Sequence, residues 1–126
     1  MAKQALKLKE NIDGEFYVDS TCIDCYACRK FSPTVFGDAS EHAYVMRQPQ
    51  NAEELLSACQ ALLSCPTASI GTIHKSDLTP ARDSFPIKLA EDVFLNGYNA
   101  RDSYGADSYL IQSPDGNWLV DSPRFT

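Results

Sequence analysis

Hydrophobic and polar positions alternate over short stretches of the chain, and each stretch predicts a strand. Residues 15–19, EFYVD, alternate well enough to predict a short first strand. Residues 42–49, HAYVMRQP, predict a second strand that ends at its proline, and residues 68–73, ASIGTI, predict a third. Between the first two, a helical turn is expected near Tyr26 until Pro33 stops it, and the turn residues of FGDASE follow.

Residues 51–65 have the clearest helical pattern. Asn51 is the predicted N-cap, and Glu54 follows it at capping-box spacing. Apolar side chains recur at helical spacing, and we expect this stripe to face a core: Ala52, Leu55, Leu56, Cys59, Leu62 and Leu63. Pro66 ends the helix. The mixture of strands and helices predicts an α+β domain over residues 1–75.

The rest of the chain has a different character. Residues 76–86 contain two prolines among polar residues and are predicted to be a linker. Residues 87–126 predict a β-rich extension of three strands. The first, IKLAEDVFLNGY, reaches a turn at Asn96 and Gly97, and the other two flank the PDGN turn. Because about forty residues cannot easily bury so many apolar side chains alone, we expect them to pack on the first domain, a second copy or a missing domain.

Charge and composition limit the possible partners. The net charge of −6 and the pI of about 4.7 oppose binding to nucleic acids and anionic membranes, and they favour partner proteins with basic docking surfaces. No apolar run is long enough for a signal peptide or a membrane span. We therefore expect a cytoplasmic protein, or one of the chloroplast stroma if a transit peptide has been removed.

Three of the five cysteines stand close together, in the sequence CIDCYAC. Cys22, Cys25 and Cys28 are three residues apart, and Cys65 follows at a distance, directly before Pro66. A structural zinc site more often uses two separated pairs of ligands. A secreted disulfide scaffold usually has an even number of cysteines distributed along the chain. Three thiols in one loop with a distant fourth favour an iron-sulfur cubane, in which each iron takes one thiolate. A zinc-stabilised interaction domain and a redox dithiol stay as weaker alternatives.

These residues resemble the bacterial-type ferredoxin family over about residues 10–75. That family repeats the pattern C-x2-C-x2-C-x3-C-P, and each repeat lends its last cysteine to the other cluster. The first cluster would take Cys22, Cys25, Cys28 and Cys65, which are all present. The second would take four positions without a thiol: Ser32, Leu55, Ala58 and Ala61. The segments SCPTASIGTI and FSPTVFG are also similar to the family.

The resemblance implies a ferredoxin-like βαββαβ fold and a single [4Fe-4S] cluster, since Cys25 supplies the ligand that three-iron clusters lack. It also implies a one-electron carrier. Because an acidic surface opposes further negative charge on the cluster, we expect a low reduction potential. The sequence contains no nucleophile-elbow, P-loop or dinucleotide-binding motif, so we expect no enzyme activity. Asp19 and Asp24 are candidates for the local field or for docking, although we interpret both as solvated loop carboxylates. Cys59 matches none of the eight ligand positions, and we expect it to be a small core side chain.

The extension resembles the first strands of metallo-β-lactamase-fold proteins. The matching text is DSYLI, SPDGN and WLVDSPRF. The metal ligands of that family lie in a later H-x-H-x-D-H run, which this sequence does not contain. An alternative function is therefore a redox-sensing or structural cluster module of a larger ferredoxin/metallo-hydrolase fusion whose catalytic part is absent here. Self-association through the C-terminal strands is a further expectation.

Overall fold

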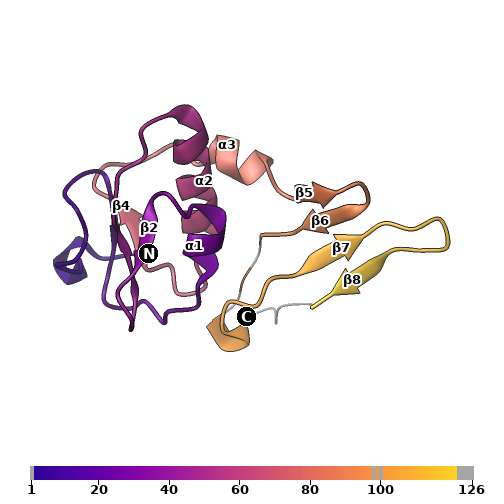
Figure 1. Ribbon diagram of the computed structural model, residues 1–126, viewed down its shortest axis with the longest axis horizontal. Helices are drawn as coiled ribbons and strands as arrows, with labels where there is room; N and C mark the ends of the chain where they lie inside the picture. The colour runs from indigo at the N-terminus through magenta and orange to yellow at the C-terminus, as the bar shows by residue number, and fades with distance from the viewer. Residues whose placement is uncertain (1, 98, 100, 122–126) are drawn as a thin grey trace.

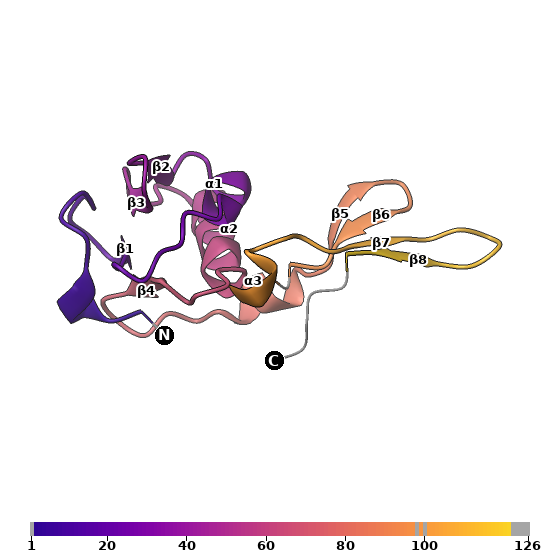
Figure 2. The same ribbon diagram turned by 90° about the horizontal axis from the view of Figure 1, so that it is seen from below.

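The computed structural model of the protein describes residues 2–97, 99 and 101–121. A packed N-terminal part contains the strands β1–β4 and the helices α1 and α2, and a ribbon of four strands, β5–β8, extends away from it (Figures 1 and 2). Among these residues, no helix is both long and apolar enough to cross a membrane.

The N-terminal part follows the predicted βαββαβ order and confirms the α+β class. A short 3-10 helix, η1 (Gln4–Leu6), comes first. The elements that follow are β1 (Phe16–Val18), α1 (Ala27–Phe31), β2 (Phe36–Asp38), β3 (Ala43–Val45), α2 (Ala52–Leu63) and β4 (Ile70–Thr72). β1 pairs antiparallel with β4, and β2 pairs antiparallel with β3. The interpretation of FGDASE as turn residues alone was wrong, because Phe36 is buried in the core and begins β2.

Helix α2 confirms its predicted cap but is rotated relative to the predicted apolar stripe. The Asn51 side chain accepts a hydrogen bond from the Glu54 N–H at 2.9 Å. Leu55 is 47% exposed, whereas Ala58 and Ala61 are fully buried. Small side chains at these positions let α2 lie closely against α1, which large leucines would prevent. Cys59 is buried in the same core, as predicted.

Asn11 joins strands that belong to different sheets. Its Nδ2 donates to the Leu8 and Val18 carbonyls at 2.7 and 2.8 Å. Its Oδ1 accepts from the Val18 and Val45 N–H groups, both at 3.0 Å. Since Val18 lies in β1 and Val45 in β3, one buried amide satisfies backbone groups of both sheets.

We expect Asn11→Ala to lower the free energy of unfolding by about 2–3 kcal/mol, because buried backbone groups lose their partners. Guanidinium unfolding under anaerobic conditions measures this loss. The control is Asn117→Ala, which changes an exposed turn residue and should cost no more than about 0.5 kcal/mol. Equal losses in both variants would contradict a central role for Asn11.

The segment predicted to be a linker contains a helix, α3 (Thr79–Asp83), which the sequence pattern did not predict. Ala81 of α3 is buried in the N-terminal core, and α3 packs against α2 (Figure 1). A five-residue helix is too short to show a helical period, so its single buried alanine could not be recognised from the pattern.

The extension forms a four-stranded antiparallel sheet in sequential order, with β5 (Ile87–Ala90), β6 (Val93–Leu95), β7 (Tyr109–Ile111) and β8 (Trp118–Val120). The prediction of one strand over IKLAEDVFLNGY was wrong, because the chain turns at Glu91 and Asp92 and pairs β5 with β6. The predicted hairpin around PDGN is confirmed as β7 and β8. Tyr98, in the predicted first strand, lies outside the described residues.

Much of this sheet stays exposed. Trp118 is 68% exposed, and Leu89 and Leu119 are more than half exposed. Figure 2 shows β7 and β8 extending beyond the N-terminal part. The expected burial of these apolar side chains is therefore not achieved within the described residues.

Candidate metal centre

Four cysteines from two distant segments meet around one cavity. Cys22 and Cys25 lie in the loop after β1, Cys28 lies in α1, and Cys65 follows α2. Apolar side chains complete the lining, among them Val18, Ile23, Ala43 and Ile70. All four thiols are free. The structure thus brings together all four residues predicted to bind the cluster, while Cys59 lies in the core and is not part of this lining.

The cysteine loop is folded so that backbone N–H groups approach the sulfur atoms. Asp24 and Tyr26 adopt left-handed conformations, with φ of 52° and 70°. Left-handed residues in such loops turn N–H groups toward a common point, where they can bind an anion. Burial raises the pKa of the Cys25 thiol, and the backbone N–H groups of Ala27 and Cys25 offset part of this rise.

The electrostatics of the cavity oppose four free thiolates. Burial raises the pKa of Cys25 and raises the pKa of Cys28 to about 12, and the other thiolates around the cavity add to both shifts. Bound iron would reverse this effect, because metal coordination deprotonates thiols and neutralises their charge. The donor set therefore fits a cationic group at its centre.

The four thiols are placed as the ligands of a cluster would be, around a shared cavity. Within residues 2–97, 99 and 101–121, no three His, Cys, Asp or Glu side chains are arranged to hold one metal ion. The four thiols surround a cavity instead, as cluster ligands must, since each thiolate binds a different iron.

The chain after Cys65 returns to the sulfur of that residue. The Ala68 N–H donates to the Cys65 carbonyl at 3.1 Å, and Ala68 adopts a left-handed φ of 51°. This turn aims the Ser69 N–H at the Cys65 sulfur, at 3.3 Å. Hydrogen bonds from backbone N–H groups stabilise thiolate charge and raise the reduction potential of a bound cluster.

The interpretation of Asp19 as a solvated carboxylate was wrong. Asp19 is only 1% exposed, so it cannot contact a docking partner. Its carboxylate accepts hydrogen bonds from the Lys3 N–H at 2.8 Å and from the Thr21 N–H at 3.0 Å. The Thr21 hydroxyl donates to it as well, at 2.5 Å. Burial alone would raise the pKa of Asp19, but these hydrogen bonds outweigh burial and lower it, so Asp19 is ionised at neutral pH.

Asp24 is not a free loop carboxylate either. It forms an ion pair with Arg29 at 2.9 Å, and Arg29 also lies 3.3 Å from an oxygen of Asp38. The Arg29 guanidinium stacks 4.8 Å from the centre of the Tyr26 ring. The pairing holds the cysteine loop against α1 and offsets part of the local negative charge. Sequence reasoning missed Arg29, because its acidic partners only meet it after folding.

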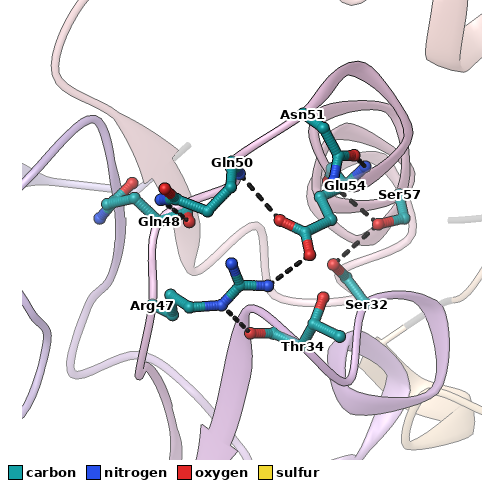
Figure 3. Close-up of polar contacts among 8 residues, drawn as sticks. All are labelled: Ser32, Thr34, Arg47, Gln48, Gln50, Asn51, Glu54 and Ser57. Atoms are coloured by element: carbon teal, nitrogen blue, oxygen red, sulfur yellow. Dashed lines mark hydrogen bonds and ion pairs between the residues drawn. The ribbon is translucent and has the colours of Figure 1, made fainter.

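The region that a second cluster would occupy is filled by packed side chains. Ser32 is buried and its hydroxyl lies 2.8 Å from that of Ser57 (Figure 3). Ala58 and Ala61 are in the core. The neighbouring polar groups are used for structure: Glu54 pairs with Arg47 and accepts a hydrogen bond from the Gln50 N–H at 2.8 Å (Figure 3).

Residues 101–107 of the extension, which we call the strap, lie against the cysteine loop. The Tyr104 hydroxyl donates to the Ile23 carbonyl at 2.9 Å, and Asp107 forms an ion pair with Lys30. Gly105 has a φ of 72°, and a Cβ at this position would lie 2.8 Å from the Cβ of Cys25. The sequence analysis allowed the extension to pack on the first domain but did not predict this contact with Cys25, since about eighty residues separate Gly105 from Cys25.

A comparison with protein-family models agrees with this geometry. Residues 18–72 match the model for the 4Fe-4S single cluster domain of Ferredoxin I. We call residues 18–72 the ferredoxin-type unit. The match indicates one [4Fe-4S] cluster, and domains of this type are typically electron carriers rather than enzymes.

The match does not extend to the C-terminal sheet. None of the comparisons supports the resemblance of this segment to metallo-β-lactamase-fold proteins. No curated protein and no solved structure matches the chain.

Proposed function

We propose that the protein is a one-electron carrier whose single [4Fe-4S] cluster is bound by Cys22, Cys25, Cys28 and Cys65. The observation that carries the proposal is the meeting of these four thiols around one cavity, supported by the family match over residues 18–72. When bound, such a cluster accepts and releases one electron without exchanging atoms. The residues of the chain hold the cluster, limit its contact with water and set its electrostatic surroundings.

We propose that the reduction potential is low. The ionised, buried Asp19 and the net charge of −6 both oppose a further negative charge on the cluster. Arg29 acts in the opposite direction, but its charge is paired with Asp24 and Asp38. The backbone N–H groups also favour reduction, as they do in clusters of this kind generally.

Voltammetry of anaerobically purified protein tests this function. We expect iron and acid-labile sulfide in equal amounts and one reversible one-electron wave at a potential well below that of the hydrogen electrode. Bleaching of the broad visible absorption should accompany reduction. One zinc ion per chain without sulfide would support the zinc-stabilised interaction domain instead.

The redox partner is proposed to be a protein with a basic docking surface, because the chain carries a net charge of −6. The rate of electron transfer to such a partner should fall as ionic strength rises. A rate independent of salt would contradict this proposal. We further propose a cytoplasmic location, or a stromal one for a chain imported into chloroplasts, which cell fractionation tests.

The exposed β5–β8 sheet favours a second candidate function. Exposed apolar side chains such as Trp118 and Leu119 would be covered if the ferredoxin-type unit were a redox-sensing or structural module of a larger protein, or if the strands associated with a second copy. A cluster that cannot be cycled without unfolding, or an H-x-H-x-D-H motif encoded beyond codon 126, would support the module. A dimer in sedimentation equilibrium would support self-association.

A further inference from the structure

A chain of three hydroxyl groups connects the buried Asp19 carboxylate to the sulfur of Cys65. The Thr21 Oγ1 lies 2.5 Å from Asp19 and 2.7 Å from the Ser69 hydroxyl. Ser69 in turn lies 2.6 Å from the Thr67 hydroxyl, and Thr67 lies 3.7 Å from the Cys65 sulfur. These residues come from two distant segments, so only folding assembles the chain.

The direction of the hydrogen bonds follows from counting protons. The ionised Asp19 can only accept, so Thr21 gives its single hydroxyl proton to Asp19. The Thr21 oxygen then faces Ser69 with its lone pairs, and Ser69 donates to it. Ser69 in turn accepts the proton of Thr67.

Thr67 therefore has no proton left for the sulfur. A cysteine that binds iron carries no proton, so the Cys65 sulfur can only accept as well. At this end of the hydroxyl chain, the Thr67 oxygen and the Cys65 sulfur face each other as two acceptors. The alternative direction would leave lone pairs of Thr21 and Ser69 in contact, and it is disfavoured because Ser69 is fully buried away from water.

We propose that Asp19 fixes the direction of this hydroxyl chain and so withholds the Thr67 hydroxyl from the Cys65 sulfur, which keeps the reduction potential of the cluster low. The inference rests on the proposed electron-carrier function. It makes Asp19, Thr21 and Ser69 positioning residues, since none of them touches the sulfur through its side chain, and Thr67 is the residue whose hydroxyl they orient. The same carboxylate also acts on the cluster through space by its charge, and the two effects can be separated experimentally.

Ser69→Ala tests the direction of the chain without changing any charge. The variant keeps the backbone N–H that donates to Cys65 but removes the acceptor of the Thr67 proton. Thr67 is then free to donate to the sulfur, which stabilises the more negative, reduced state. We expect a positive shift of the midpoint potential. The iron–sulfur stretching bands in resonance Raman spectra should also become more sensitive to replacing H₂O with D₂O.

The double variant shows whether the shift passes through Thr67. Thr67→Val removes the hydroxyl, so adding Ser69→Ala to it should leave the potential unchanged. Thr21→Val interrupts the chain at an exposed residue, and it should also shift the potential positively, because Ser69 can then donate to Thr67. Ser57→Ala is the matched control, since its hydroxyl pairs with Ser32 instead, and it should have no effect.

Two results would overturn the inference while leaving the carrier function intact. One is an unchanged or lowered potential in both Ser69→Ala and Thr21→Val. The other is a shift by Ser69→Ala that persists in the Thr67→Val background. Absence of iron and sulfide from the unmodified protein would overturn the proposed function itself.

Discussion

We expect Cys65→Ala to abolish retention of the iron-sulfur cluster and Cys59→Ala to leave the cluster in place. Cys65 lines the cavity with the three cysteines of the N-terminal segment, so its loss leaves one iron without a protein thiolate. Cys59 is only six residues away, but its sulfur is buried in the core. Iron and acid-labile sulfide analysis of both anaerobically purified variants measures the difference.

Cys59→Ala serves as the matched control, because it removes the same chemical group from the same helical region. We expect it to lower the free energy of unfolding by about 1 kcal/mol through lost packing, with the iron content unchanged. If both variants retain equal amounts of cluster, the assignment of Cys65 as a ligand is wrong.

We expect Gly105→Ala to accelerate loss of the cluster to a chelator by roughly tenfold, the equivalent of about 1.4 kcal/mol of opening free energy. A Cβ at this position would lie 3.0 Å from the Cys25 sulfur and 2.8 Å from its Cβ. The left-handed φ of 72° adds strain of about 1 kcal/mol in any residue other than glycine. Both effects move the strap away from the cysteine loop and admit water and chelator to it.

Gly116→Ala separates contact with the cysteine from backbone strain. Gly116 also has a positive φ, of 131°, but among the described residues nothing lies within 4 Å of a Cβ built there. Its substitution should leave the rate of bleaching by a chelator unchanged. Tyr104→Phe removes only the hydrogen bond to Ile23 and should accelerate bleaching about twofold to fivefold. Equal rates in all three variants would mean that the strap does not protect the cluster.

Contact through the strap gives the extension a structural role at the cluster despite the exposure of its sheet. Further contacts support the segment that leads to the strap. The Ser64 hydroxyl donates to the Gly97 carbonyl at 2.7 Å, and the Asn99 side chain donates to the Ser64 carbonyl at 2.9 Å. Because Ser64 directly precedes Cys65, the same backbone holds a proposed ligand and the extension.

Local patterns along the chain were enough to predict the elements and residues whose cause is local. The capped helix α2 depends on neighbours three and four residues apart, and Cys22, Cys25 and Cys28 stand at a spacing that one loop can wrap around a cluster. The fourth thiol was identified because the family pattern specifies a proline after it. Strand β2 was missed because Gly37 and Asp38 are residues typical of turns. The turn between β5 and β6 was missed because it contains neither glycine nor proline, the strongest turn signals.

Which polar groups act at the candidate site depends on the folded chain. The sequence suggested that Asp19 is a solvated carboxylate. In the folded chain Asp19 is buried and accepts hydrogen bonds from Lys3 and Thr21. The link from Thr21 to Ser69 and the contact of Gly105 with Cys25 join residues far apart in sequence. The energies of these two contacts depend on distances that are set only when the long loops of the chain close. A local pattern of residues therefore cannot predict the contacts.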